Sequence, residues 1–279
     1  FRSKYYGKVV QSPLRRRGFA PKLSDEEAIT IQLVGEFLGL DEDKRIYQHF
    51  KNNYASWFPC LGSYPNFCKQ LANLSFVCQA MLTRLGQDFG ALSPFCVDGF
   101  PIAVCHYVRA RRCQAFKGLA NFGYCASKQE KYFGFKGQII VSAEGLIVAY
   151  TLIPANTDER VTLDEVTDHL QGVLIGDKGY ISQELRQAMQ QKGIDLQTPY
   201  RQNMKAKHSP SHHNWLCKQR KTVEVVISQL VERFHIAKTK TKDIHHFSHR
   251  FVRKLLSHTT AVVICKLLGY PALQLARIS

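Results

Sequence analysis

The chain has 279 residues, 45% hydrophobic and 22% charged, which predicts a globular protein with one large domain or a main domain and a smaller one. Its 38 Lys and Arg against 22 Asp and Glu give a net charge of +16. That balance favours an anionic partner, most often nucleic acid, with an anionic membrane surface as the alternative. No apolar run approaches the roughly 20 residues that cross a bilayer, which argues against a membrane protein.

The N-terminal part of the chain is predicted to be a basic arm followed by a small helical domain. Residues 1–22 are basic and contain Arg15-Arg16-Arg17, so they form either a DNA-contacting arm or a solvated tail. Within residues 23–90, Ser24 and Glu27 have capping-box spacing at the start of a helix that Gly39 would end. Two further helices are predicted, over residues 43–54 and 66–85. Three such helices form either a DNA-binding helix-turn-helix or a structural cap.

From Pro94 onward the pattern changes to short β-branched runs that alternate with helical segments. A strand is predicted over 95–104, with Pro101 at its end or at a bulge. The later strands are predicted over 132–142, 146–153, 173–176 and 194–198, the first two joined as a hairpin. Helices are predicted over 163–170, 182–192, 217–234 and 250–268, and a mobile polar loop over 201–214. This order predicts an α/β fold with a mixed sheet flanked by helices.

Three acidic residues interrupt or flank these elements in a way that points to metal chemistry. Asp98 lies within the first strand, Asp177 ends a short buried strand, and Glu224 lies on the long helix, away from its main apolar face. Two or three carboxylates on rigid elements suit divalent magnesium, and two such ions can cleave a phosphodiester bond. Arg220 and Lys221 lie within one turn of Glu224 and are predicted to hold DNA phosphates. The competing interpretations are a turn residue for Asp177 and a solvated helix face for Glu224.

The sequence resembles bacterial insertion-sequence transposases of the DDE type, most closely the insertion-sequence family numbered nine hundred and eighty-two. The similarity runs from about Leu23 to Leu268. The N-terminal segments that carry it are Lys22–Thr30 and Phe58–Phe67. The later ones are Val97–Ile102, Lys131–Gly137, Pro154–Arg160, Gly176–Tyr180, Thr198–Arg201 and Arg220–Glu224. Two positions depart from the family pattern, because Gly99 and Val225 stand where Ser and Thr are common.

The resemblance implies an RNase H-like catalytic domain over 91–237, preceded by the helical domain and followed by a C-terminal helical extension, 238–279, packed on the catalytic domain. It implies a metal-binding catalytic triad of Asp98, Asp177 and Glu224 with two divalent ions, magnesium or manganese. The implied partners are double-stranded DNA, both terminal inverted repeats and target, and further copies of the chain in a dimer or higher oligomer. The DNA-binding residues expected are Lys178, Arg201, Arg220 and Lys221. The expected location is the bacterial cytoplasm, at the nucleoid.

Two other functions fit the same residues: a degenerate, non-catalytic transposase that only binds DNA, and a simple metal-dependent nuclease. Nine cysteines without Cys-x-x-Cys spacing predict a reducing compartment and no structural zinc. The histidines fall in two groups, one before and one after Glu224, and neither has a recognised zinc-ligand pattern. The first group is His208, His212, His213 with Cys217, and the second is His245, His246 and His249. Tyr180 is predicted to be a packing or DNA-backbone residue.

Overall fold

The computed structural model describes residues 2–10, 21–90, 93–126, 129–201, 209–238, 241 and 243–278. The chain divides into two compact units. The helical unit comprises Phe1–Leu85 and Leu230–Ala261, and the sheet unit comprises Gly86–Gln229 and Val262–Ser279. The predicted C-terminal extension is therefore shared between the units, and its part up to Ala261 groups with the N-terminal helices rather than with the sheet.

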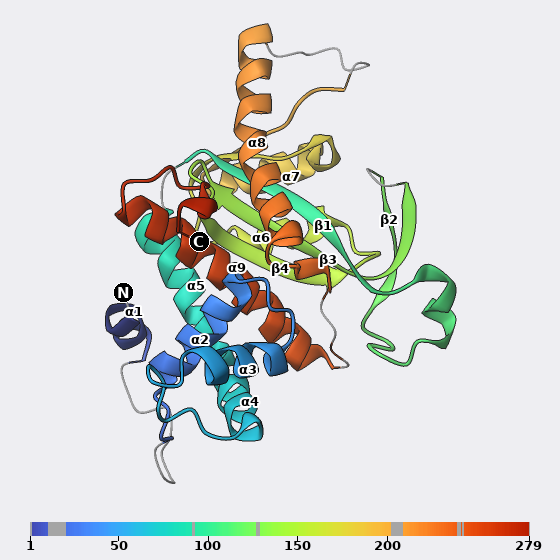
Figure 1. The fold of residues 1–279 in the computed structure, drawn as a ribbon. Helices are drawn as coiled ribbons and strands as arrows, with labels where there is room; N and C mark the ends of the chain where they lie inside the picture. Colours follow the sequence, from blue (N-terminus) through green and yellow to red (C-terminus); the bar gives the residue numbers. More distant parts are fainter. Residues whose placement is uncertain are drawn as a thin grey trace. The chain divides into compact units, whose positions relative to one another are not determined.

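The helical unit contains the predicted N-terminal helices. They are α1 (Arg2–Val9), α2 (Asp25–Phe37), α3 (Asp43–Asn53), α4 (Tyr64–Asn73) and the larger part of α5 (Ser75–Phe89) (Figure 1). The capping box of α2 is confirmed: Ser24 Oγ accepts the Glu27 N–H, and the Glu27 carboxylate accepts the Ser24 N–H. Part of the predicted arm is the helix α1, where the Tyr6 hydroxyl donates to Asp25 at 3.1 Å. Arg15–Arg17 lie outside the described residues.

The helix predicted over residues 66–85 is in fact two helices, α4 and α5. The α4 helix begins earlier than predicted because Pro65 lies in its first turn, where a missing N–H costs nothing. It ends at Leu74, whose N–H bonds to the carbonyl groups of Leu71 and Ala72. This tightened last turn separates two helices that share one run of apolar residues, so periodicity alone could not detect the break.

Helix α9 (Ile244–Leu267) brings buried cations to acids of the helical unit. Arg253 forms ion pairs with Glu36 and Asp43, and Lys254 pairs with Glu36. The side chains of Glu36 and Arg253 are 0% and 1% exposed. Because unpaired charges are costly in such a site, these ion pairs hold the first part of α9 against α2 and α3.

The sheet unit contains a six-stranded mixed sheet, which confirms the predicted fold class (Figure 1). Its strands are β1 (Phe95–Cys105), β2 (Asn121–Cys125), β3 (Glu130–Ser142), β4 (Ile147–Pro154), β5 (Gly172–Ile175) and β6 (Ile194–Gln197). The strand order is β2-β3-β1-β5-β6, and β4 also pairs with β3. The β1–β3, β2–β3 and β3–β4 pairs are antiparallel, whereas β5 is parallel to β1 and to β6.

The two faces of this sheet have different roles. One face packs against α6 (Glu159–Val166) and α7 (Gln183–Gln191), and its core includes Phe95 and Val97 of β1. The opposite face carries Cys96 and Asp98, because side chains alternate along a strand. Helix α8 (Pro210–Glu232) crosses this second face, where the Cys96 thiol donates to the Gln219 carbonyl at 3.3 Å.

Several boundaries differ from the prediction for identifiable reasons. Strand β1 continues through Pro101, because β5 pairs only with Phe95 and Cys96 and leaves that end of β1 free on one edge. Helix α6 begins earlier than predicted, where the Asp158 carboxylate accepts the Arg160 N–H. Strand β2 and the 3₁₀ helix Tyr107–Arg112 were not predicted.

Helices α8 and α9 also begin earlier than predicted, each behind a polar side chain. Ser209 accepts the His212 N–H and is followed by Pro210, so residues 210–214 are helical rather than part of a mobile loop. Residues 202–208 of that predicted loop lie outside the described residues. Asp243 accepts the His246 N–H at the start of α9. Over the described part of the chain, no helix has the length and apolar character that crossing a membrane requires.

Candidate active site

Asp98 lies in β1 on the face that α8 crosses, and its surroundings disfavour the charged form. Its side chain is 24% exposed and accepts the Gly99 N–H at 2.8 Å. Burial is the main cause that raises the pKa of Asp98, to about 6. The Gly99 hydrogen bond and Arg220 lower it, whereas Asp177 and Glu159 raise it. A carboxyl group with like charges nearby is a candidate ligand for a cation.

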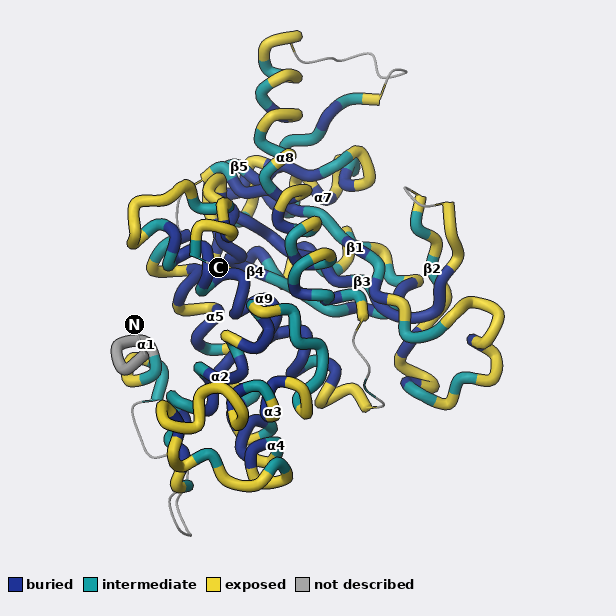
Figure 2. Tube along the Cα trace, in the orientation of Figure 1, coloured by how far each residue is buried: buried dark blue, intermediate teal, exposed yellow. Residues whose placement is uncertain are grey.

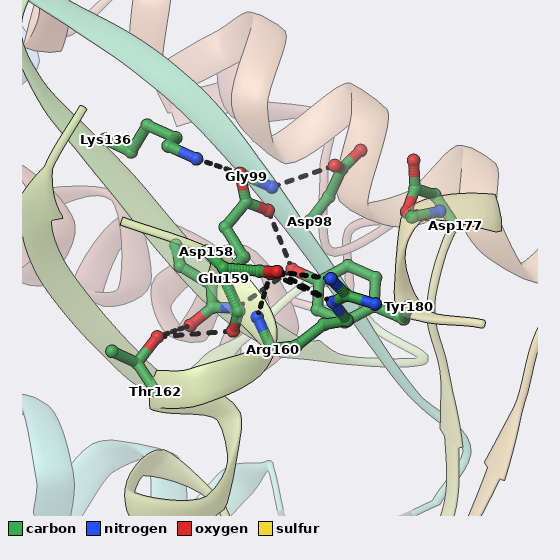
Figure 3. Close-up of polar contacts among 11 residues, drawn as sticks. Asp98, Gly99, Lys136, Asp158, Glu159, Arg160, Thr162, Asp177 and Tyr180 are labelled. Carbon is green, nitrogen blue, oxygen red and sulfur yellow. Dashed lines mark hydrogen bonds and ion pairs between the residues drawn. The ribbon is translucent and has the colours of Figure 1, made fainter. Parts of the chain in front are cut away.

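Asp177 follows β5 at the sheet position next to Asp98. The parallel register pairs Phe95 with Leu174 and Cys96 with Ile175, so continuing it places Asp177 opposite Asp98. Figure 3 shows the two side chains beside each other. One oxygen of Asp177 accepts the Gly179 N–H at 2.7 Å, as a turn residue would. The turn contact uses one carboxylate oxygen, so it is compatible with a second role for the other.

Glu224 lies on α8, and Arg220 of the same helix connects it with Asp98. One guanidinium nitrogen of Arg220 lies 3.9 Å from an Asp98 oxygen and 3.7 Å from a Glu224 oxygen. Arg220 Nε is buried without a hydrogen-bond partner among the described residues. The guanidinium therefore holds both acids by long contacts, and a cation that bound the acids directly would meet a carboxylate donor set suited to magnesium.

The three carboxylates are near one another without forming a closed cluster. Among the described residues, the one group of three His, Cys, Asp or Glu ligand atoms within 4.8 Å of one another is Asp243, His245 and His246. These three are exposed, and the Asp243 oxygens already accept from the backbone and ring of His246. His249 is separate from them: it is buried and bonded to Gln32 at 3.0 Å, and burial lowers its pKa to about 3.

Of the four predicted DNA-binding cations, Arg220 alone contacts the acids in the part of the chain that the structure describes. Lys178 directly follows Asp177, and its carbonyl accepts from Arg201 at 3.2 Å. Lys178, Arg201 and Lys221 are exposed, whereas Arg220 is directed at the acids. Three of these cations are thus available to a polyanion in solution, and Arg220 occupies the site itself.

Glu159, at the start of α6, is a fourth acid near the site, and sequence reasoning did not identify it. Its carboxylate accepts from the buried Tyr180 hydroxyl at 2.9 Å and lies 3.4 Å from the Lys136 ammonium (Figure 3). A Cβ at position 99 would lie 2.6 Å from a Glu159 oxygen, so the glycine leaves room for the carboxylate in this position. Glu159 lies in the segment Pro154–Arg160, which carries part of the family resemblance, and this was the available signal.

Gln138 of β3 connects this acid to Tyr180. Its amide donates to the Tyr180 hydroxyl at 2.9 Å and to the Glu159 carbonyl at 3.0 Å, and its oxygen accepts from Thr162 at 3.1 Å. Burial and then Glu159 raise the pKa of Tyr180 well above its ordinary value, so it stays a neutral donor. Gly176 permits this packing, because a Cβ there would lie 2.9 Å from the Tyr180 ring. Tyr180 is therefore a packing and bracing residue, directed at Glu159.

Comparison with known proteins agrees with this architecture. A family model described as "Transposase DDE domain" matches residues 93–244, which include Asp98, Asp177 and Glu224. Among solved structures, a cryo-EM structure of the piggyBac transposase synaptic complex with hairpin DNA is similar, with a TM-score of 0.55 and 10% sequence identity. The similarity covers 98% of this chain and 74% of that chain and, at this identity, concerns the fold alone. No curated protein matches the chain. Because the family model spans more than half of the sequence, the chain belongs to the DDE transposase domain family.

Proposed function

We propose that this protein cleaves the ends of an insertion sequence and transfers the freed 3′ hydroxyl to target DNA. The observation that carries the proposal is the position of Asp98 in β1 opposite Asp177, which follows the neighbouring parallel strand β5, with Arg220 linking Asp98 to Glu224. The segments shared with the insertion-sequence family numbered nine hundred and eighty-two support membership of that subfamily. The proposed partners are terminal inverted repeats and target DNA, held by a dimer or higher oligomer.

The residues of the site have distinct proposed roles. Asp98, Asp177 and Glu224 would bind two divalent ions, magnesium or manganese, which supply charge neutralisation and an acidified water. The raised pKa of Asp98 is what a site awaiting a cation should show, because a bound cation favours the carboxylate. Arg220, released from the acids, would pair with a phosphate of the strand being cut. Lys178, Arg201 and Lys221 would hold neighbouring phosphates and position the strand.

The proposed reaction has two steps at one site. In the first, a water oxygen forms a bond to phosphorus and the P–O3′ bond breaks, which leaves a 3′ hydroxyl on the element and a 5′ phosphate on the flank. In the second, that hydroxyl forms a bond to a target phosphorus and the target P–O3′ bond breaks. One phosphodiester is made for each one broken in the second step, so no external energy source and no covalent protein intermediate is needed.

Replacement of Asp177 by Asn tests the proposal. Magnesium-dependent nicking of a labelled inverted-repeat duplex should fall below detection for Asp177→Asn, with DNA affinity at or above that of the wild type. Glu165→Gln removes an exposed acid of the same unit and serves as the matched control, with unchanged nicking. Undiminished nicking by Asp177→Asn would refute the assignment. Wild-type cutting without preference for the repeat would indicate a simple nuclease, and selective binding without cutting would indicate a degenerate transposase.

A further inference from the structure

The segment after β1, residues 106–125, ends with β2 and forms a surface that the proposed active site does not use. We call it the basic lobe. It contains four Lys and Arg residues and no Asp or Glu. Its 3₁₀ helix, Tyr107–Arg112, presents Arg109, Arg111 and Arg112 to solvent. None of these three arginines has an ion-pair partner among the described residues, and Figure 2 shows much of the segment as exposed.

Aromatic side chains lie on the same surface. Tyr107, Phe122 and Tyr124 are 44%, 43% and 61% exposed. Tyr107 meets Phe122 edge to face with ring centroids 5.6 Å apart, and Phe122 lies 5.1 Å from Phe133 of β3. Exposed aromatic rings grouped in this way are uncommon on a surface that contacts only water. Together with charge of a single sign, they indicate a partner that is both anionic and aromatic.

The basic lobe is anchored to the sheet. Phe116 is buried and packs edge to face on Phe135, with centroids 5.5 Å apart. Its backbone has φ +57°, a conformation that a bulky residue adopts only when its surroundings enforce it. The five residues of β2 pair with β3, from Asn121 opposite Gly134 to Cys125 opposite Glu130. The exposed rings and arginines are therefore presented by a fixed framework.

The strand register places the aromatic rings on the same face of the sheet as Asp98. Phe122 pairs with Phe133, Tyr124 pairs with Lys131, and Asp98 pairs with Ile139. Residues 131, 133 and 139 of β3 share one face, because side chains alternate along a strand. From 139 to 133 is about 20 Å at roughly 3.3 Å per residue. On DNA this is about six nucleotides, at roughly 3.4 Å per phosphate along one strand.

We propose that the basic lobe binds DNA about six to eight nucleotides from the phosphate at Asp98, with its arginines on the backbone and its tyrosines stacked on unpaired bases. The inference rests on the proposed function, since it needs DNA on the Asp98 face. Positive charge with interleaved aromatic rings is the chemistry of single-strand recognition, in which each base offers a π-face to a ring. A protein partner of this surface would have to supply acidic groups for the three arginines.

The first test measures binding of the whole protein in EDTA, so that no cutting occurs. The probes are a labelled duplex and the same duplex with an unpaired thymine tract. Each of Arg109→Gln, Arg111→Gln and Arg112→Gln should reduce the slope of log affinity against log salt by about one for both probes. Tyr124→Leu should weaken binding of the unpaired probe about tenfold and leave the duplex nearly unchanged. The matched control is Arg186→Gln, an exposed arginine on α7 across the sheet, with no change.

The second test locates the contact and separates this inference from the proposed function. Photo-crosslinking with 5-bromouracil moved along the strand should peak at Tyr124 about eight nucleotides from the cut, because its partner Lys131 is about 26 Å along β3 from the partner of Asp98. Unchanged salt slopes in the arginine variants, or crosslinks that avoid the basic lobe, would overturn the inference even if the protein cuts DNA. Loss of self-association without loss of DNA affinity would also overturn it, in favour of a contact between chains. Binding that depends on the basic lobe but without any cutting would leave the inference standing and sink the proposed catalysis.

Discussion

Asp43 in the helical unit and Asp98 in the sheet unit have nearly equal side-chain exposure, 27% and 24%, yet opposite electrostatic surroundings. For Asp43, burial is outweighed by Arg253 and Arg250, which hold its pKa below the ordinary value. For Asp98, repulsion from Asp177 and Glu159 adds to burial, and the pKa rises to about 6. The neighbours therefore decide the role: the first acid completes an ion-pair network, and the second lies among other acids, where the long contact with Arg220 does not offset burial and repulsion.

Glu36→Gln should produce the largest change in stability, because it removes a carboxylate from the buried ion-pair network that includes Asp43. The substitution leaves the buried Arg253 and Lys254 without the carboxylate that pairs with both and should destabilise the protein by about 3–5 kcal/mol. Urea unfolding measures the change. Glu26→Gln, on the same helix and without an ion pair among the described residues, should cost under about 0.5 kcal/mol. A loss of less than about 1 kcal/mol for Glu36→Gln would mean that the network does not hold α9.

Asp98→Asn should change stability in the opposite direction to Glu36→Gln and stabilise the metal-free protein. The folded pKa lies above the unfolded one, so ionisation costs stability, and this cost grows as pH rises from about 4 to about 6. The neutral amide removes the cost and should add about 2–3 kcal/mol near pH 7.5, with the difference vanishing near pH 4. Unfolding in EDTA at both pH values checks this, with Glu165→Gln as control. A destabilised variant near pH 7.5 would contradict the proposed repulsion.

Tyr180→Phe tests the hydrogen bonds that hold Glu159 near Asp98. It removes the hydroxyl that donates to Glu159 and accepts from Gln138, so two partners lose a contact in a buried place. The expected loss is about 2 kcal/mol of unfolding free energy. Tyr270→Phe, which deletes the hydroxyl of a 40% exposed ring, should be nearly neutral. Equal stability of the two variants would show that the hydrogen bonds of the Tyr180 hydroxyl do not stabilise the fold.

The smallest expected effect is in the helical unit. There the free energy of unfolding should fall as pH falls, which is the opposite direction to the effect of Asp98. Burial lowers the pKa of His258 to about 3, so it is neutral when folded and takes up a proton on unfolding below about pH 6.5. Its contribution is complete above that pH and is lost as pH falls, at about 1.4 kcal/mol per unit. His258→Gln should flatten the slope by one proton, whereas exposed His106→Gln should not. Identical slopes in wild type and His258→Gln would contradict this.

Much of the fold follows from local patterns, and the rest depends on contacts between distant residues. The capping pair Ser24 and Glu27 located α2 correctly, and alternation located β1 and β3. Strand β2 was missed because Asn121 and Gly123, both of types that are depleted in strands, interrupt its short sequence. The starts of α8 and α9 were missed because Ser209 and Asp243 were taken as loop residues.

The candidate site shows the same limit. Asp98, Asp177 and Glu224 were a hypothesis from the sequence. The structure adds the contacts of Arg220 with Asp98 and Glu224. It also adds the strand register that places Asp177 opposite Asp98. Glu159 could not be identified as a neighbour of Asp98 from spacing, because it comes from α6 on the other face of the sheet. Only the empty space at Gly99 lets its carboxylate approach so closely.

That close approach makes the placement of the Glu159 carboxylate depend on the residue at position 99. A serine at position 99, the common residue in the resembling family, could not coexist with the Glu159 carboxylate in its present place, since the two would overlap. A serine at position 99 would therefore require the flexible end of the Glu159 side chain to turn aside, which would change its contacts with Lys136 and Tyr180.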